Sequence, residues 1–301
     1  MRQIAPGVFW LPLGVSNAYF IGDVSGPWIV IDSGTPGHFE TIRAAATERF
    51  GADSKPEAVV LTHGHFDHAG SALALAAHYD VPIYVHPGEM PFVSGKSKYP
   101  PGDPTVGGFF AFLFRFMPPS GTDLGRFVRV LPEDGTVPGL PGWKWLHTPG
   151  HTPGHVSLWR EQDKVLVAGD AVITVNVDSA IAMTTQRQEI CRPPAPATTD
   201  WDAARASVEK LAALKPYTVA AGHGLPFPGP QVASELQTLA DDFERPAHGR
   251  YRSEPAKTNE QGVVSVPPPA SDPLPKVLVG VGLALVVIGL LARAPQHRTE
   301  K

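Results

Sequence analysis

The sequence is poor in cysteine: Cys191 is the only one among 301 residues. A framework of disulfide bonds is therefore excluded, and so is a metal site built from several thiolates. No stripe of basic residues is present and the net charge is only −4, which argues against a nucleic acid as partner. The N-terminal residues also lack the long apolar core of a secretory signal peptide.

Apolar residues, in contrast, are abundant. They make up 43% of the chain, enough for a sizeable core in one large domain or two small ones. Short apolar runs predict β-strands at residues 8–13, 18–21, 28–31, 58–61, 81–85, 127–131, 143–146, 156–159, 165–168 and 217–221. Longer stretches predict helices at residues 38–50, 69–77, 200–214 and 231–243.

The densest polar cluster is Thr-His-Gly-His-Phe-Asp-His at residues 62–68. It lies between a predicted strand and a predicted helix, where side chains on a rigid scaffold can converge on one point. Imidazole and carboxylate are the ligands that Zn²⁺ and other borderline divalent ions take when no thiolate is offered. The cluster therefore predicts a metal site.

Three later motifs extend this pattern: Thr-Pro-Gly-His-Thr-Pro-Gly-His at 148–155, Ala-Gly-Asp at 168–170 and Ala-Gly-His-Gly at 221–224. In this order, the four motifs resemble those of the metallo-β-lactamase superfamily, over roughly residues 5–245. The repeated Thr-Pro-Gly-His is similar to the glyoxalase II branch. The resemblance implies an α+β fold, a four-layer αββα sandwich.

The resemblance also implies a site with two metal ions. Its expected ligands are His63, His65 and His151 for one ion, Asp67, His68 and His223 for the other, and Asp170 as a bridge. We expect two Zn²⁺ per chain, with Fe or Mn as alternatives. Asp67 is also the expected catalytic residue that orients the attacking water. Asp32 and His155 are expected to hold the ligands in position without binding the metal themselves.

The implied function is hydrolysis of a small molecule. A hydroxide bound by two metals would attack an ester, a thioester or a lactone. One alternative is an iron-dependent oxidoreductase on the same fold, similar to persulfide dioxygenases. Another is a non-catalytic metal-binding module tethered to a membrane. The sequence shows no basic cluster for the carboxylates of glutathione, which argues against hydroxyacylglutathione as the substrate.

Residues 109–117 contain five phenylalanines in nine positions. Three interpretations remain open from the sequence. The stretch could be an ordinary core helix, it could line a substrate pocket, or it could dip into a membrane surface.

The C-terminal part has a different composition. We expect a catalytic domain at 1–245, a Pro-rich linker at 246–275, a transmembrane helix at 276–293 and a polar tail at 294–301. The segment between Lys276 and Arg293 holds 16 residues without a charge, close to the length that spans a bilayer. Basic residues are more numerous before it than after it. The sequence therefore predicts a single-pass protein of the cell membrane, bound to the lipid bilayer through 276–293, with a cytoplasmic catalytic domain.

Overall fold

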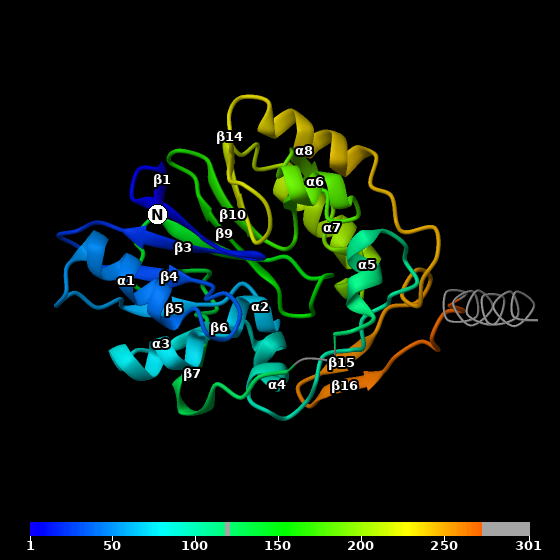
Figure 1. Ribbon diagram of the computed structural model, residues 1–301, viewed down its shortest axis with the longest axis horizontal. Helices are drawn as coiled ribbons and strands as arrows, with labels where there is room; N and C mark the ends of the chain where they lie inside the picture. The colour runs from blue at the N-terminus through cyan, green and yellow to red at the C-terminus, as the bar shows by residue number, and fades with distance from the viewer. Residues whose placement is uncertain (118–120, 273–301) are drawn as a thin grey trace, which may run out of the picture.

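Two β-sheets lie at the centre of the molecule, and helices cover their outer faces (Figure 1). The computed structural model describes residues 1–117 and 121–272. Within this part of the chain, one sheet has seven strands and the other has five, and there are two further two-stranded sheets.

The seven-stranded sheet follows the order of the sequence, from β1 to β7. Its strands are β1 (Arg2–Ala5), β2 (Val8–Leu13), β3 (Ser16–Gly22), β4 (Trp28–Ile31), β5 (Ala58–Val60), β6 (Ile83–Val85) and β7 (Val128–Val130). The first four strands are antiparallel, and β4 to β7 run parallel to one another. The carboxyl ends of the parallel strands therefore meet at one edge of the sheet.

The five-stranded sheet has the order β14-β13-β10-β9-β8. Its strands are β8 (Trp143–His147), β9 (Val156–Arg160), β10 (Val165–Gly169), β13 (Thr218–Ala221) and β14 (Phe227–Pro228). Because β10 and β13 are parallel, the loops that follow them also leave the sheet at the same edge.

Four hydrophobic clusters are found among the described residues, and the three large ones correspond to the spaces between four layers. Between the sheets, Ile29 of β4 belongs to the same buried cluster as Leu158 of β9. Outside the first sheet lie α1 (Phe39–Phe50) and α3 (Ala72–Tyr79). Outside the second lie α7 (Trp201–Ala212) and α8 (Val232–Asp241). This arrangement confirms the four-layer αββα sandwich.

The remaining elements are short. They are α2 (Phe66–Ala69), α4 (Met90–Val93), α5 (Phe109–Phe114), α6 (Ala180–Thr185), the 3₁₀ turns η1 (Pro87–Glu89), η2 (Gly125–Phe127) and η3 (Ala195–Ala197), the pair β11 (Ile173–Val175) and β12 (Gln188–Cys191), and the pair β15 (Lys257–Asn259) and β16 (Gly262–Ser265).

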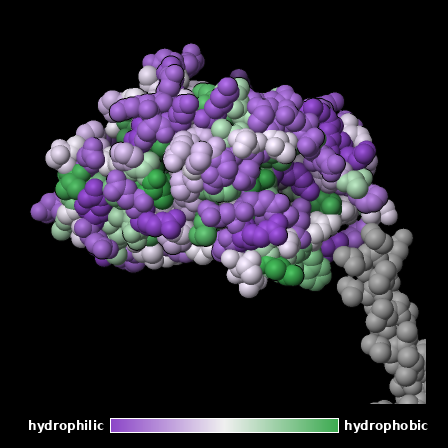
Figure 2. All heavy atoms as spheres, turned by 90° about the horizontal axis from the view of Figure 1, so that it is seen from above, coloured by the Kyte–Doolittle hydropathy of each residue, from purple (hydrophilic) through white to green (hydrophobic). Residues whose placement is uncertain are grey.

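The Phe-rich stretch forms α5 and the residues after it, and it is not a core helix. Within α5 only Ala111 is buried. Phe112 is 44% exposed and Phe116 is 75% exposed. On the face seen in Figure 2, hydrophobic residues form small separate groups among hydrophilic ones.

Of the predicted Pro-rich linker at 246–275, the part up to the end of β16 at Ser265 packs against the domain. Tyr251 is 2% exposed, and its hydroxyl donates a hydrogen bond to the carbonyl of Pro101 at 2.6 Å. Further along, β15 and β16 form a hairpin, and Val263 N donates to Ser97 Oγ at 3.3 Å. Buried contacts and strand pairing therefore hold this segment against the domain as far as β16.

The structure contradicts the predicted single-pass membrane localisation. No helix of residues 1–117 and 121–272 is long and apolar enough to cross a bilayer. The longest, α1 and α7, have 12 residues each, or about 18 Å against a hydrocarbon core of about 30 Å. The segments that carried the prediction, 276–293 and 294–301, lie outside the described residues.

Candidate metal centre

The seven predicted ligands come from both sheets and meet at one edge of the sandwich. Each follows a strand or lies in the loop or short helix after it. His63 and His65 follow β5, Asp67 and His68 lie on α2, His151 lies between β8 and β9, Asp170 follows β10, and His223 follows β13. The parallel strands explain the convergence, because their carboxyl ends point to the same edge.

Three imidazoles form the first cluster. His63 Nε2 lies 3.0 Å from His65 Nδ1, and His151 Nε2 lies 3.1 Å from the same His65 atom. Two nitrogens bound at about 2.0–2.1 Å in a tetrahedral zinc site are about 3.3 Å apart. The three nitrogens are therefore spaced as ligands of one small cation.

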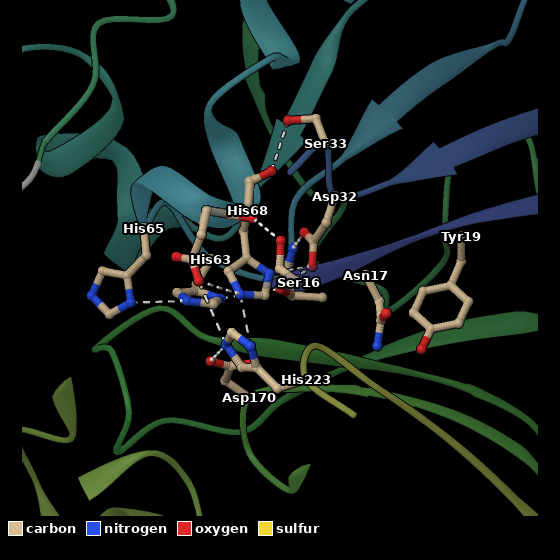
Figure 3. A network of polar contacts seen from close by, with 12 residues as sticks. Ser16, Asn17, Tyr19, Asp32, Ser33, His63, His65, His68, Asp170 and His223 are labelled. Carbon is tan, nitrogen blue, oxygen red and sulfur yellow. Dashed lines mark hydrogen bonds and ion pairs between the residues drawn. The ribbon is translucent and has the colours of Figure 1, made fainter. Parts of the chain in front are cut away.

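The second cluster combines Asp67, His68 and His223, which can also share a cation. Asp67 Oδ2 is 3.8 Å from His68 Nε2 and 3.5 Å from His223 Nε2. Asp170 lies between the clusters: its Oδ1 is 3.6 Å from His68 Nε2, and its Oδ2 is 3.4 Å from His151 Nε2. Figure 3 shows His68, His223 and Asp170 directed toward one another.

Two buried atoms of this site have no hydrogen-bond partner among the described residues, His68 Nε2 and Asp170 Oδ1. Buried polar atoms without a partner are costly and rare in folded proteins. A cation placed between them would satisfy both. The residues present therefore fit a pair of divalent ions.

The outer nitrogens of three imidazoles are fixed by other groups. Nδ1 of His63 donates to Thr62 Oγ1 at 3.1 Å. Nδ1 of His68 donates to Asp32 Oδ2 at 2.8 Å, and Nδ1 of His223 donates to the Val15 carbonyl at 2.7 Å. In each ring this directs Nε2 toward the site, as in histidines that bind metals.

Asp32 and His155, the two expected supporting residues, each contact a predicted ligand. Asp32 adopts a left-handed backbone with φ of 57°, a conformation that Asp tolerates better than most residues. Its Oδ2 accepts from both His68 Nδ1 and Thr62 Oγ1 at 2.8 Å. His155 Nε2 accepts from Asp170 N at 2.9 Å, which holds the backbone of that residue.

Buried charges divide the imidazoles into two groups. Burial lowers the pKa of His65 to about 4 and lowers the pKa of His63 and His151 well below the ordinary value. At His68 burial acts in the same direction, but the negative charge of Asp170, followed by that of Asp67, raises its pKa to about 10. Asp170 likewise outweighs burial and raises the pKa of His223 to about 9.

The pKa of the central carboxylate, Asp170, is shifted downward. Burial of Asp170 favours its neutral form, but the positive charges of His223 and His68 outweigh this and hold its pKa well below the usual range. In the metal-free protein, protons on these two histidines thus balance the carboxylates. Divalent cations would take over this role and release the protons.

Gly222 packs closely against two of the predicted ligands. A Cβ on this residue would lie 2.0 Å from Asp170 Oδ1 and 2.7 Å from His68 Cε1. The glycine before His223 is therefore needed for the carboxylate to reach its position.

Glu89 and Tyr99 are residues that the sequence analysis missed. Glu89 is fully buried. Its Oε2 accepts from Gly64 N at 2.9 Å and from the Tyr99 hydroxyl, and its Oε1 accepts from Thr152 Oγ1 and Gly154 N, both at 2.8 Å. Glu89 thereby ties the loop of the first motif to the loop of the second. No local pattern in the sequence signals this role, because the partners come from distant segments.

The first two residues of β3, Ser16 and Asn17, also support the site, and the sequence analysis missed them too. Asn17 Nδ2 donates to the carbonyls of Ala221 and Gly224 at 2.9 and 2.7 Å. Ser16 Oγ donates to the carbonyl of Asp67. Figure 3 shows Ser16 and Asn17 beside the cluster. These contacts fix the loops on either side of the second group of ligands.

Comparison with known proteins agrees with this geometry. Residues 11–223 match the family described as the metallo-β-lactamase superfamily. A probable metallo-hydrolase, YflN of Bacillus subtilis (strain 168), is 44% identical over 242 residues, covering 79% of this chain and 92% of the relative. Hydroxyacylglutathione hydrolase GloC of Haemophilus influenzae is 30% identical over 129 residues, covering 40% and 51%.

Solved structures show the same fold. The crystal structure of TTHA1623 in a di-iron-bound form is 26% identical with a TM-score of 0.51, covering 79% of this chain and 99% of that one. The BLEG-1 B3 metallo-β-lactamase, at 22% identity and a TM-score of 0.53, covers 78% and 96%. Since the family match spans both sheets and the loops that carry the clustered histidines, the protein belongs to the metallo-β-lactamase superfamily.

Proposed function

We propose that the protein is a hydrolase that uses two divalent metal ions to cleave an ester, a thioester or a lactone. The observation that carries the proposal is the pair of three-residue clusters with Asp170 between them. In the proposed assignment, His63, His65 and His151 hold one ion, Asp67, His68 and His223 hold the other, and Asp170 bridges. We propose Zn²⁺ for both positions, because the donors are imidazole and carboxylate.

When bound, such a pair of cations supplies an acidified water and polarises the substrate's carbonyl oxygen. The protein's own residues position the reaction. Asp67 lines the cavity beside the site. Its carboxylate would accept a hydrogen bond from the attacking water, which would orient the water, and would then take up the water's proton. Asp32 and His155 would keep His68 and Asp170 in place through the contacts described above.

The test is a panel of ester, thioester, lactone and phosphodiester substrates on the purified full chain, with metal content measured on the same sample. We expect about two equivalents of metal and hydrolysis of at least one carbonyl substrate. His65→Ala and Asp170→Ala should lose both metal and activity. Two equivalents of metal with no hydrolysis of any of these substrates would contradict the proposed hydrolase.

An iron-dependent oxidoreductase is the second candidate. It is favoured by the similarity to TTHA1623, which was solved in a di-iron-bound form. Iron in the purified protein together with oxygen uptake on a persulfide would support this function. Zinc content with hydrolysis and no oxygen uptake would support the first.

A further inference from the structure

A cavity of about 510 Å³ opens from the candidate metal centre. Its volume lies within the range of about 300–1,000 Å³ that is typical of small-molecule sites. Asp67, His151, Asp170 and His223 line one part of it. A molecule in this cavity would thus reach both clusters.

Most of the other lining residues are apolar, and three of them come from α5. Phe110, Leu113 and Phe114 face the cavity, together with Met183 of α6. The rings of Phe110 and Phe114 lie 5.6 Å apart at 72°, an edge-to-face contact that fixes their orientation. The helix therefore presents two aromatic rings, the aromatic wall, to the same cavity that the predicted metal ligands line.

Phe112 and Phe116 form a second pair, with rings 5.9 Å apart. Neither lines the cavity, and both are exposed. The same stretch thus has a cavity face and a solvent face with matching aromatic pairs, and these can be altered separately.

Gly102 holds the wall in position. A Cβ on Gly102 would lie 1.9 Å from Phe114 Cε1, so the phenyl ring rests directly on the glycine backbone. At the start of the helix, Phe109 N donates to the carbonyl of Asp178 at 3.0 Å. The place of Phe114 is therefore set by the fold as well as by its neighbour on the helix.

Charged recognition groups are scarce in this cavity. Among the described residues that line it, Arg115 is the one lysine or arginine. Its guanidinium donates two hydrogen bonds to the carboxylate of Asp272, at 3.1 and 3.0 Å. The positive charge is thus balanced within the protein, and a carboxylate on the substrate would find no unpaired basic side chain here.

We propose that the cavity binds the uncharged, apolar acyl group of the substrate and that Phe110 and Phe114 determine this specificity. The inference rests on the proposed hydrolase function, because it names the substrate class of that site. Each methylene buried against the wall would raise the specificity constant up to about four-fold. Esters of medium-chain acids should therefore be preferred over acetate and over acyl groups that carry a carboxylate.

The experiment compares kcat/KM for p-nitrophenyl acetate, butyrate and octanoate. We expect kcat/KM of the unaltered protein to rise with chain length. Phe114→Ala should lower it for octanoate by about ten-fold, mainly through KM, and leave acetate nearly unchanged. The matched control is Phe112→Ala, which removes the same ring from the solvent face and should keep the preference.

Two further measurements separate the possible outcomes. Calorimetry with acetate and octanoate reports chain-length-dependent binding without any reaction, and Gly102→Ala displaces the Phe114 ring without removing it. Octanoate binding that depends on Phe114, with no ester hydrolysed, would support the apolar cavity and refute the hydrolase. Hydrolysis with equal kcat/KM for all three esters, or a preference unchanged in Phe114→Ala and Gly102→Ala, would overturn the inference and leave the hydrolase standing.

Discussion

Glu89 and Thr152 are 63 residues apart in the sequence, yet their side chains meet in a hydrogen bond of 2.8 Å beneath the metal centre. The other carboxylate oxygen of Glu89 accepts from Gly64 N. Glu89 thus connects the loop that carries His63 and His65 to the loop that carries His151. We therefore expect the relative position of these two loops to depend on this buried carboxylate.

The first prediction concerns Glu89→Gln. The amide has nearly the same shape, but its NH₂ group would face two N–H or O–H donors in place of an acceptor. We expect the free energy of unfolding to fall by about 2–3 kcal/mol and the affinity for the metal of the first cluster to fall as well. Urea denaturation and metal titration measure the two effects.

The matched control is Glu48→Gln on the exposed side of α1. It makes the same chemical change without touching the site, so stability and metal affinity should stay the same. If Glu89→Gln left stability and metal affinity unchanged, as this control should, the link that Glu89 makes between the two loops would contribute to neither property.

Much of the fold could be predicted from the sequence, because the signals are local. The apolar runs at 8–13 and 28–31 coincide with β2 and β4. The predicted helix at 200–214 is α7, and the side chain of Asp200 caps its N-terminus, a position at which Asp is preferred. The metal motifs also carry their own order, so the clustering of their histidines and carboxylates could be anticipated.

Long-range contacts could not be predicted in this way. Glu89 has no motif around it, and its role appears only once the two loops lie together. The Phe-rich stretch places aromatics on both faces of α5, so its periodicity does not show which face meets the cavity. The hairpin of β15 and β16 lies in a segment whose prolines indicate a linker, and contacts with distant residues such as Ser97 override that local signal.

The second prediction concerns Asp32→Asn. Asn tolerates the left-handed backbone at this position, so the change tests the carboxylate alone. Asp32 Oδ2 accepts from both His68 Nδ1 and Thr62 Oγ1, and an NH₂ group there could accept from neither. We expect the affinity for the metal of the second cluster to fall by about 10–100-fold, measured by competition with a chelator. An affinity equal to that of the unaltered protein would show that Asp32 does not support His68.

The third prediction concerns Gly222→Ala. Its added Cβ would overlap Asp170 Oδ1 at 2.0 Å, so the bridging carboxylate must move. We expect loss of about one equivalent of metal and of hydrolysis, with the fold retained as judged by circular dichroism. Gly26→Ala is the control, since a Cβ there meets nothing within 4 Å. Full metal content in Gly222→Ala would contradict the placement of Asp170 between the two ions.

The fourth prediction is that the stability of the metal-free protein is greatest near neutral pH. The pKa of His68 is raised to about 10 and that of His223 to about 9, both above the value of about 6.5 in an unfolded chain. The folded protein therefore holds more protons above pH ~6.5, and its stability falls as the pH rises toward 9–10.

Below pH ~6.5 the dependence of stability on pH has the opposite sign. Burial lowers the pKa of His65 to about 4 and that of His155 to about 3, so below pH ~6.5 the unfolded chain binds more protons and stability falls as the pH drops. Bound metal would displace the protons of His68 and His223, which removes the alkaline decline and makes the decline below pH ~6.5 steeper. Urea denaturation from pH 5 to 9.5, with chelator and with saturating Zn²⁺, tests both limbs. A metal-free protein equally stable at pH 7 and 9 would show that carboxylates do not hold protons on these histidines.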